Sequence, residues 1–312
     1  MPADDVDRHT GAGHFSFLRM RPMTLFETGH TNGAISLAAL FDGDTPRSPD
    51  PGLSIRDLAD RITVGGWPAQ HDRRLVDAAR AARDYLEQTR QVDMSRVAGS
   101  RRDPAKVGRL LQSLARNTST EVAATVLAAD AGGGDGPLDR HTVVEYLDIL
   151  DRLMVIEDQP AWAPHLRSRA VLRTSPKRHF VDPSLAVAAL GTSPERLLKD
   201  FNFLGLLFES LVIRELRVLA QPLDGPVWYY RDNYGVETDA VVQPADGRWA
   251  AFEVKLGAGL VDDGAASLQR FRQSIDTAKS GEPTLLAVIC GTGYGSQRPD
   301  GISVIPIGPL AP

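Results

Sequence analysis

The stretch VETDAVVQPADGRWAAFEVKLG, residues 236–257, decides the fold of the C-terminal part of the chain. Two runs rich in Val, Ala and aromatic residues flank the segment Pro-Ala-Asp-Gly, a pattern typical of a β-hairpin. Each run nevertheless carries charged residues where a half-buried strand normally has apolar ones. Asp239 lies in the first run, with Glu237 on the same face by strand alternation, and Glu253 and Lys255 lie in the second.

The length of the turn decides whether these charges meet. A two-residue turn at 246–247 would place Asp239 opposite Val254, whereas a three-residue loop at 245–247 places it opposite Glu253. Three-residue hairpin loops prefer a final residue in the left-handed conformation, usually glycine, and the sequence Ala-Asp-Gly fits that form. We therefore predict that Asp239, Glu253 and Lys255 share one face of a sheet.

Such a cluster needs a counter-charge, because two neighbouring carboxylates repel each other and are costly to bury. A hard divalent cation such as Mg²⁺ removes that cost, and a lysine beside it orients a water molecule. Glu209, inside the apolar run LGLLFESLVI, is a further candidate for the cluster. The alternatives are a salt-bridge ladder on an exposed sheet face and a solvent-facing Glu209 on an amphipathic helix.

The rest of the C-terminal part reads as alternating helices and strands. A helix is expected over 200–220, strands over 226–232, 236–243 and 248–256, a second helix over 264–276, and further strands over 284–291 and 302–308. This order predicts an α/β domain over residues 200–312 with a mixed sheet and flanking helices.

The middle of the chain, residues 51–190, reads as mainly helical. Helices are expected over 53–63 with Ser54 as cap, over 70–90, over 103–118 beginning at Asp103-Pro104, over 119–130 with Ser119 and Thr120 as cap region, and over 139–154. Strands over 155–162 and 175–183 follow. Three helices and a two-stranded wing predict a winged helix-turn-helix. Residues 1–50 are irregular, and their short apolar pieces need a partner surface.

DNA contact is expected at the wing rather than at the last of the three helices. That helix carries more acidic than basic residues, which opposes entry into the major groove. The loop before the second wing strand and the start of that strand are basic. The expected phosphate contacts are Arg167, Arg169, Arg173, Lys177 and Arg178.

Composition narrows the class of protein. The chain has 312 residues, 42% hydrophobic residues and a net charge of −5, as expected of a globular protein without a dominant basic surface. The lone Cys290, a polar N-terminus and the absence of a long apolar run predict a cytoplasmic protein without membrane contact. Five of the 35 basic residues are lysines, so arginine is the default cation and a lysine is informative.

Asp239 followed by Glu253-Val254-Lys255 after a hairpin, with Glu209 on a preceding helix, resembles the PD-(D/E)XK nuclease superfamily. The resemblance implies that Asp239 and Glu253 bind Mg²⁺, that Lys255 positions the attacking water and that Glu209 assists. The proline that precedes the aspartate in the superfamily is absent here, since the sequence reads VETDAVV.

A wider resemblance covers roughly residues 15–310. The segments LRMRPMTLFETG, ISLAALFDG, GGWP, SPKRHFVDPSLAVAALG, GLLFESLVIREL and VETDAVV…FEVKLG together resemble an uncharacterised bacterial and archaeal AAA-type ATPase family. Its members have an ATPase module, a winged helix and a C-terminal domain of unknown function related to PD-(D/E)XK nucleases.

The P-loop motif G-x-x-x-x-G-K-[ST] of that ATPase module does not occur in the sequence, so no ATP site is expected. The resemblance implies that residues 1–50 are a remnant of the module, including Arg19 and Arg21.

These features predict a DNA-interacting protein with a Mg²⁺-dependent nuclease-like C-terminal domain. One alternative is a non-catalytic regulatory module that binds DNA or protein. The other is an ATPase pseudo-subunit that docks on a homologous or partner ATPase through residues 15–45.

Overall fold

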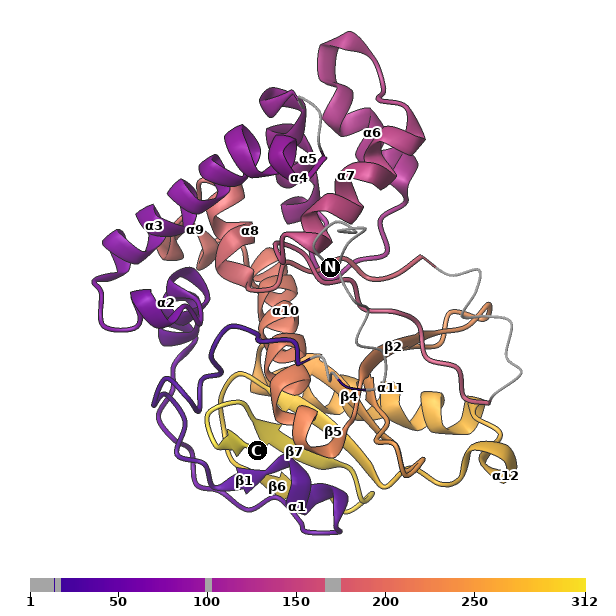
Figure 1. The fold of residues 1–312 in the computed structure, drawn as a ribbon. Helices are drawn as coiled ribbons and strands as arrows, with labels where there is room; N and C mark the ends of the chain where they lie inside the picture. Colours follow the sequence, from indigo (N-terminus) through magenta and orange to yellow (C-terminus); the bar gives the residue numbers. More distant parts are fainter. Residues whose placement is uncertain (1–13, 15–17, 99–102, 166–174) are drawn as a thin grey trace.

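The structure of the chain is a computed structural model that describes residue 14 and residues 18–98, 103–165 and 175–312. Most of the helices gather at one end of the molecule, and a six-stranded sheet forms the other end (Figure 1). Helix α10 (Phe201–Leu219) runs from the helical end onto the sheet and joins the two parts. The expected α/β class with a mixed sheet is confirmed.

The other elements are spread along the described residues. The helices are α1 (Leu37–Phe41), α2 (Ile55–Val64), α3 (Leu75–Gln88), α4 (Met94–Ala98), α5 (Pro104–Arg116), α6 (Ala124–Gly132), α7 (Arg140–Arg152), α8 (Pro183–Leu190), α9 (Pro194–Leu197), α11 (Val261–Ser274) and α12 (Thr277–Ser280). The strands are β1 (Ile35–Ser36), β2 (Val227–Arg231), β3 (Glu237–Val242), β4 (Ala250–Lys255), β5 (Leu285–Cys290), β6 (Ser296–Gln297), β7 (Ser303–Pro306) and β8 (Leu310–Ala311).

Side-chain caps fix where several helices begin. Ser54 and Asp57 form a reciprocal capping box at the start of α2, and Asp103 accepts from the backbone N–H of Ala105 at 2.9 Å at the start of α5. Both starts were predicted. The predicted cap of the next helix was wrong, because α6 begins at Ala124 while Ser119 bonds the backbone of the wing.

Helices α5, α6 and α7 are followed by two paired extended segments, in the order that the sequence predicted. We call residues 155–162 and 175–181 the wing. Its two segments pair antiparallel at Ile156 with Phe180 and at Gln159 with Lys177. The first segment also bridges to the edge strand β2, where Ala161 pairs in parallel with Tyr229. The wing therefore lies against the sheet as well as against the helices.

The sheet has the order β2-β3-β4-β5-β7-β6, with β2, β3 and β4 as an antiparallel meander and β4, β5 and β7 parallel. Ala240 pairs with Phe252 and Val242 with Ala250, which is the predicted register of the hairpin. The paired residues end earlier than a three-residue loop requires, and residues 243–249 connect the strands. Within that connection Gly247 has a φ of 86°, in the left-handed region expected of it.

Two helices cover the two faces of the sheet. Helix α10 packs on the face that carries Ala240 and Phe252, and α11 packs on the face that carries Val241 and Ala251. The lone cysteine, Cys290, is buried at the end of β5. Glu253 and Lys255 continue the alternation of Ala251 and so belong to the α11 face. The helix over them is what buries the predicted cluster.

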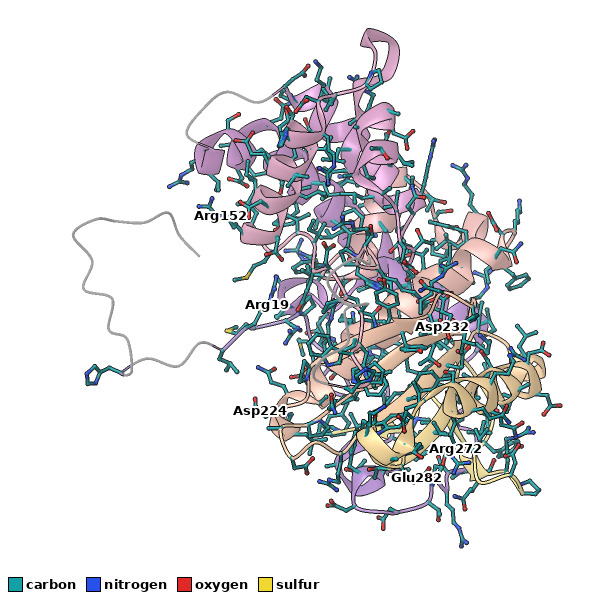
Figure 2. The ribbon with its side chains drawn as sticks, turned by 90° about the vertical axis from the view of Figure 1, so that its right-hand side faces the viewer. Arg19, Arg152, Asp224, Asp232, Arg272 and Glu282 are labelled. Atoms are coloured by element: carbon teal, nitrogen blue, oxygen red, sulfur yellow. The ribbon has the colours of Figure 1, made fainter. Side chains whose placement is uncertain are left out.

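The described part of the N-terminal segment finds its partner surface within the same chain. Strand β1 pairs in parallel with β8, with Ile35 opposite Leu310, and α1 lies beside the sheet (Figure 1). Arg21 makes a two-pronged pair with Glu157 of the wing, at 2.7 and 3.1 Å. Arg19, seen between the helices and the sheet in Figure 2, bonds Asp151 at 3.3 Å.

Candidate functional site

Asp239 lies in an irregularity of the sheet. The pairing of β2 with β3 shifts by one residue between Trp228 opposite Val241 and Tyr230 opposite Thr238. Asp239 and Ala240 therefore both lie opposite Tyr229, as in a β-bulge. Bulges interrupt the ladder and re-aim side chains, and they are frequent beside active sites. At this one the carbonyl of Asp239 accepts from the side chain of Gln159.

The other neighbour of β3 diverges at the same place. The β3–β4 ladder ends at Ala240 and Phe252, and beyond it the carboxylate of Asp239 replaces a backbone carbonyl by accepting from Val254 N–H at 2.8 Å. One step further in the same register brings Glu253 opposite Asp239. The ladder thus ends at this point, and both residues are buried, at 9% and 4% exposed.

Lys255 joins the two acids. Its Nζ lies 2.7 Å from Glu253 Oε2 and 3.9 Å from Asp239 Oδ2. The stem of this lysine passes under α11, because a Cβ added to Gly264 would lie 3.3 Å from its Cγ. The structure therefore brings together three residues that the sequence predicted as neighbours.

A second ammonium enters the cluster from the wing. Lys177 is 3% exposed, and its Nζ lies 2.9 Å from Glu209 Oε1, 3.0 Å from Glu237 Oε1 and 3.4 Å from Asp239 Oδ1. Glu209 is thus part of the same group of charges, and its link to Asp239 runs through Lys177. Lys177 was predicted as a contact to DNA phosphate, but an ammonium buried among carboxylates has no free surface to offer one.

Gln159 holds the wing in this position. Its side-chain Nε2 donates to Trp228 O at 2.8 Å and to Asp239 O at 2.9 Å, so the amide bridges the bulge between β2 and β3. Its backbone bonds Lys177 in both directions, at 2.9 and 3.0 Å. Its Oε1 faces His179 Nε2 at 3.1 Å. One buried amide therefore joins the wing, the carbonyl of Asp239 and the lysine that faces the Asp239 carboxylate.

Carboxyl groups outnumber ammonium groups in this cluster. Its carboxylates are those of Glu209, Glu237, Asp239 and Glu253, and its ammonium groups are those of Lys177 and Lys255. Burial, together with Asp239, raises the pKa of Glu209 to about 8 and that of Glu253 to about 7. Burial alone would lower the pKa of Lys177, but its three carboxylate neighbours hold it well above the usual value. Lys177 is therefore charged and fixed at neutral pH.

The predicted metal ligands fit Mg²⁺ in kind, because carboxylate oxygens are the ligands that this ion prefers. A cation already stands beside Asp239 in the form of the Lys177 ammonium. The arrangement of the predicted metal ligands nevertheless differs from that of a metal centre. In the positions that they occupy, the described residues include no group of three or more His, Cys, Asp or Glu able to hold a metal ion. A metal ion bound to Asp239 Oδ1 would have to displace the Lys177 ammonium, which lies 3.4 Å from that oxygen.

The remaining predicted contacts to DNA are placed only in part. Arg167, Arg169 and Arg173 lie outside the described residues. Arg178 pairs with Asp158 through its Nη1, and its side chain is 12% exposed. Among the described residues of the wing, the two predicted contacts are thus engaged with acidic partners of the same chain.

Sequence reasoning missed Gln159 and the role of Lys177. A signal for Lys177 existed, since lysine is rare in this chain and a compact ammonium on a flexible stem reaches a narrow gap better than a guanidinium does. No sequence signal pointed to Gln159, because its side chain bridges a bulge that forms only when β2 and β3 pair.

Two family models match the chain. Residues 204–310 match the domain of unknown function DUF4143. This domain is often associated with AAA-type ATPases. Residues 55–196, which contain the helices and the wing, match the domain of unknown function DUF8612. Comparisons with curated proteins and with solved structures gave no match. Among the described helices, none has the length and apolar character needed to span a membrane.

Proposed function

We propose that the C-terminal part of the chain is a Mg²⁺-dependent nuclease-like domain of the PD-(D/E)XK type that hydrolyses phosphodiester bonds in DNA. The observation that carries this proposal is the meeting of Asp239, Glu253 and Lys255 where two strands diverge. Two carboxylates for a divalent cation and one ammonium for water and phosphate are the groups that this chemistry needs.

The order of elements supports the proposal. Helix α10 is followed by the meander β2-β3-β4, by α11, and by β5, which runs parallel to β4. An acid-bearing helix, an acid-bearing strand and then the strand with Glu253 and Lys255 is the order on which the resemblance to the nuclease superfamily rests. The association of DUF4143 with AAA-type ATPases supports a partner ATPase as the protein with which the chain works.

Each residue has a distinct role in this proposal. Asp239 and Glu253 would hold the Mg²⁺ ion, which supplies polarisation of a phosphate oxygen and lowers the pKa of a water. The ammonium of Lys255, anchored on Glu253 at 2.7 Å, would orient the attacking water and offset the charge that develops on the phosphate. Glu209 would act through Lys177, which it contacts at 2.9 Å, rather than by touching the substrate.

A non-catalytic module that binds DNA or protein is the second candidate, and Lys177 favours it. An ammonium fixed among Glu209, Glu237 and Asp239 neutralises these acids without a metal ion. Such a domain would keep the acids for the stability of the fold and would have lost the reaction.

A metal titration separates the two candidates. Calorimetry with Mg²⁺ and Mn²⁺, taken to millimolar concentration, would compare the wild type with Asp239→Asn and with Asp84→Asn, an exposed acid on α3 that serves as control. The nuclease proposal expects heat of binding in the wild type and in Asp84→Asn that is lost in Asp239→Asn. It also expects DNA cleavage that Lys255→Ala abolishes with an unchanged circular dichroism spectrum. Cleavage that survives Lys255→Ala would contradict it.

A further inference from the structure

Lys177 is a residue of the wing whose ammonium is buried among carboxylates of other elements. It belongs to the wing, yet its ammonium lies within 3.4 Å of carboxylates from α10 and from β3. Its side chain is 4% exposed, whereas that of Lys255 in the same cluster is 25% exposed. An ammonium this deep is stable only with several charged partners, which it has in Glu209, Glu237 and Asp239.

These contacts occupy the acid that would bind a metal ion. Asp239 Oδ1 faces Lys177, and Asp239 Oδ2 accepts from Val254 N–H at 2.8 Å. Both oxygens of the carboxylate therefore already have a positively polarised partner. A divalent cation that approached Asp239 would be repelled by the ammonium and would compete with it for Oδ1.

We propose that Lys177 is a built-in competitor of the divalent cation, so that a metal ion binds at Asp239 only when the ammonium of Lys177 has withdrawn. This inference rests on the proposed function, because it concerns the same metal site. It adds a residue outside the DUF4143 match that sets the metal affinity of a site inside it.

The wing determines how readily the ammonium withdraws. The backbone of Lys177 is paired with Gln159 in both directions, and Gln159 is bonded to the carbonyls of Trp228 and Asp239. Tyr229 adds a further link, because its hydroxyl donates to Ser175 O at 2.5 Å. The lysine stem can move only as far as this anchored backbone allows. Metal affinity at Asp239 is therefore coupled to the docking of the wing on β2.

Removal of the ammonium tests the competition directly. Mn²⁺ would be titrated calorimetrically into the full chain as wild type, as Lys177→Met and as Lys279→Met, a surface lysine paired with Asp276 that serves as control. If the ammonium is withdrawn in no more than a tenth of the wild-type molecules, Lys177→Met binds at least about tenfold more tightly. Asp239→Asn placed in the Lys177→Met background should abolish that gain.

The outcomes distinguish the two proposals. Equal and measurable affinity in the wild type and Lys177→Met would overturn the competition and leave the metal site standing. No binding in either protein would overturn both. Because Lys177→Met leaves the largely buried Glu209 and Asp239 without their ammonium and so threatens the fold, a second measurement uses the wild type. Saturating Mn²⁺ should increase acylation of Lys177 relative to Lys279, and unchanged protection of Lys177 in the metal-bound protein would refute the competition.

Discussion

Gln159 offers the sharpest test of how the wing and the sheet are joined. The substitution Gln159→Leu keeps the approximate size of the side chain and removes its polar atoms. Three polar groups then lose this partner: the part-buried carbonyl of Trp228 at 2.8 Å, the buried carbonyl of Asp239 at 2.9 Å and the buried Nε2 of His179 at 3.1 Å. Each buried polar group left without a partner costs about 1–3 kcal/mol, and the lower value for each gives a loss of about 3 kcal/mol.

Urea unfolding followed by tryptophan fluorescence and circular dichroism measures this loss. Gln269→Leu is the matched control, because Gln269 bonds Asp300 at an exposed position and its replacement should change stability by less than about 0.5 kcal/mol. Hydrogen exchange should also rise in the peptide that covers β2 and β3. A destabilisation below about 1 kcal/mol would show that the amide is not what closes the bulge, and the reasoning about the wing would fail with it.

Three further predictions concern the rest of the chain. Arg214 is 3% exposed and pairs with Asp182 at 2.6 Å and with Glu215, so Arg214→Met should lower the unfolding free energy by about 3–5 kcal/mol. The control Arg272→Met, in the exposed pair with Glu282 (Figure 2), should lower it by less than about 1 kcal/mol. Equal losses in the two variants would contradict this prediction. Burial, with Arg217 and Lys177, holds the pKa of His179 well below 6.5, so the unfolded chain takes up a proton below that pH before the folded chain does. Its contribution to stability is therefore complete above pH 6.5 and falls by up to about 1.4 kcal/mol per pH unit as the pH decreases, and His179→Gln should remove this slope in unfolding curves taken between pH 5 and 7. A Cβ on Gly66 would lie 2.1 Å from Met23 O, so Gly66→Ala should destabilise by about 1–3 kcal/mol in a thermal melt, whereas Gly205→Ala, with nothing within 4 Å, should be neutral or stabilising.

The sequence predicted those parts of the fold that local rules govern. The caps at Ser54 and Asp103 and the register that sets Asp239 opposite Glu253 follow from short-range chemistry, and all three agree with the structure. The cap at Ser119 was wrong because a long-range pair took precedence, since the backbone of Ser119 bonds Arg178 O at 2.8 Å. Local propensity cannot reveal that a strand from another part of the chain will compete for a cap residue.

In the candidate site, too, local rules predicted some residues and tertiary structure determined the others. Asp239, Glu253 and Lys255 lie within a single hairpin, so strand alternation and the predicted register were enough to bring them together, although residues 243–249 connect the strands in place of the predicted three-residue loop. Lys177 lies 62 residues from Asp239, and no periodicity connects the two. Its approach depends on the docking of the wing on β2 through Ala161 and Tyr229, which is a property of the tertiary structure.

This dependence bears on which piece of the chain can report on the site. A fragment that began at residue 200 would contain Glu209, Asp239, Glu253 and Lys255, yet it would lack Lys177, Gln159 and the β1 partner of β8. The carbonyl of Asp239 would lose its donor and the bulge would lose its bridge, while the competing ammonium would also be gone. Metal binding by such a fragment would mix a gain from the missing lysine with a loss from a disturbed strand. Only the full chain, with single substitutions at Lys177 and Gln159, separates the charge of the wing from its support of β3.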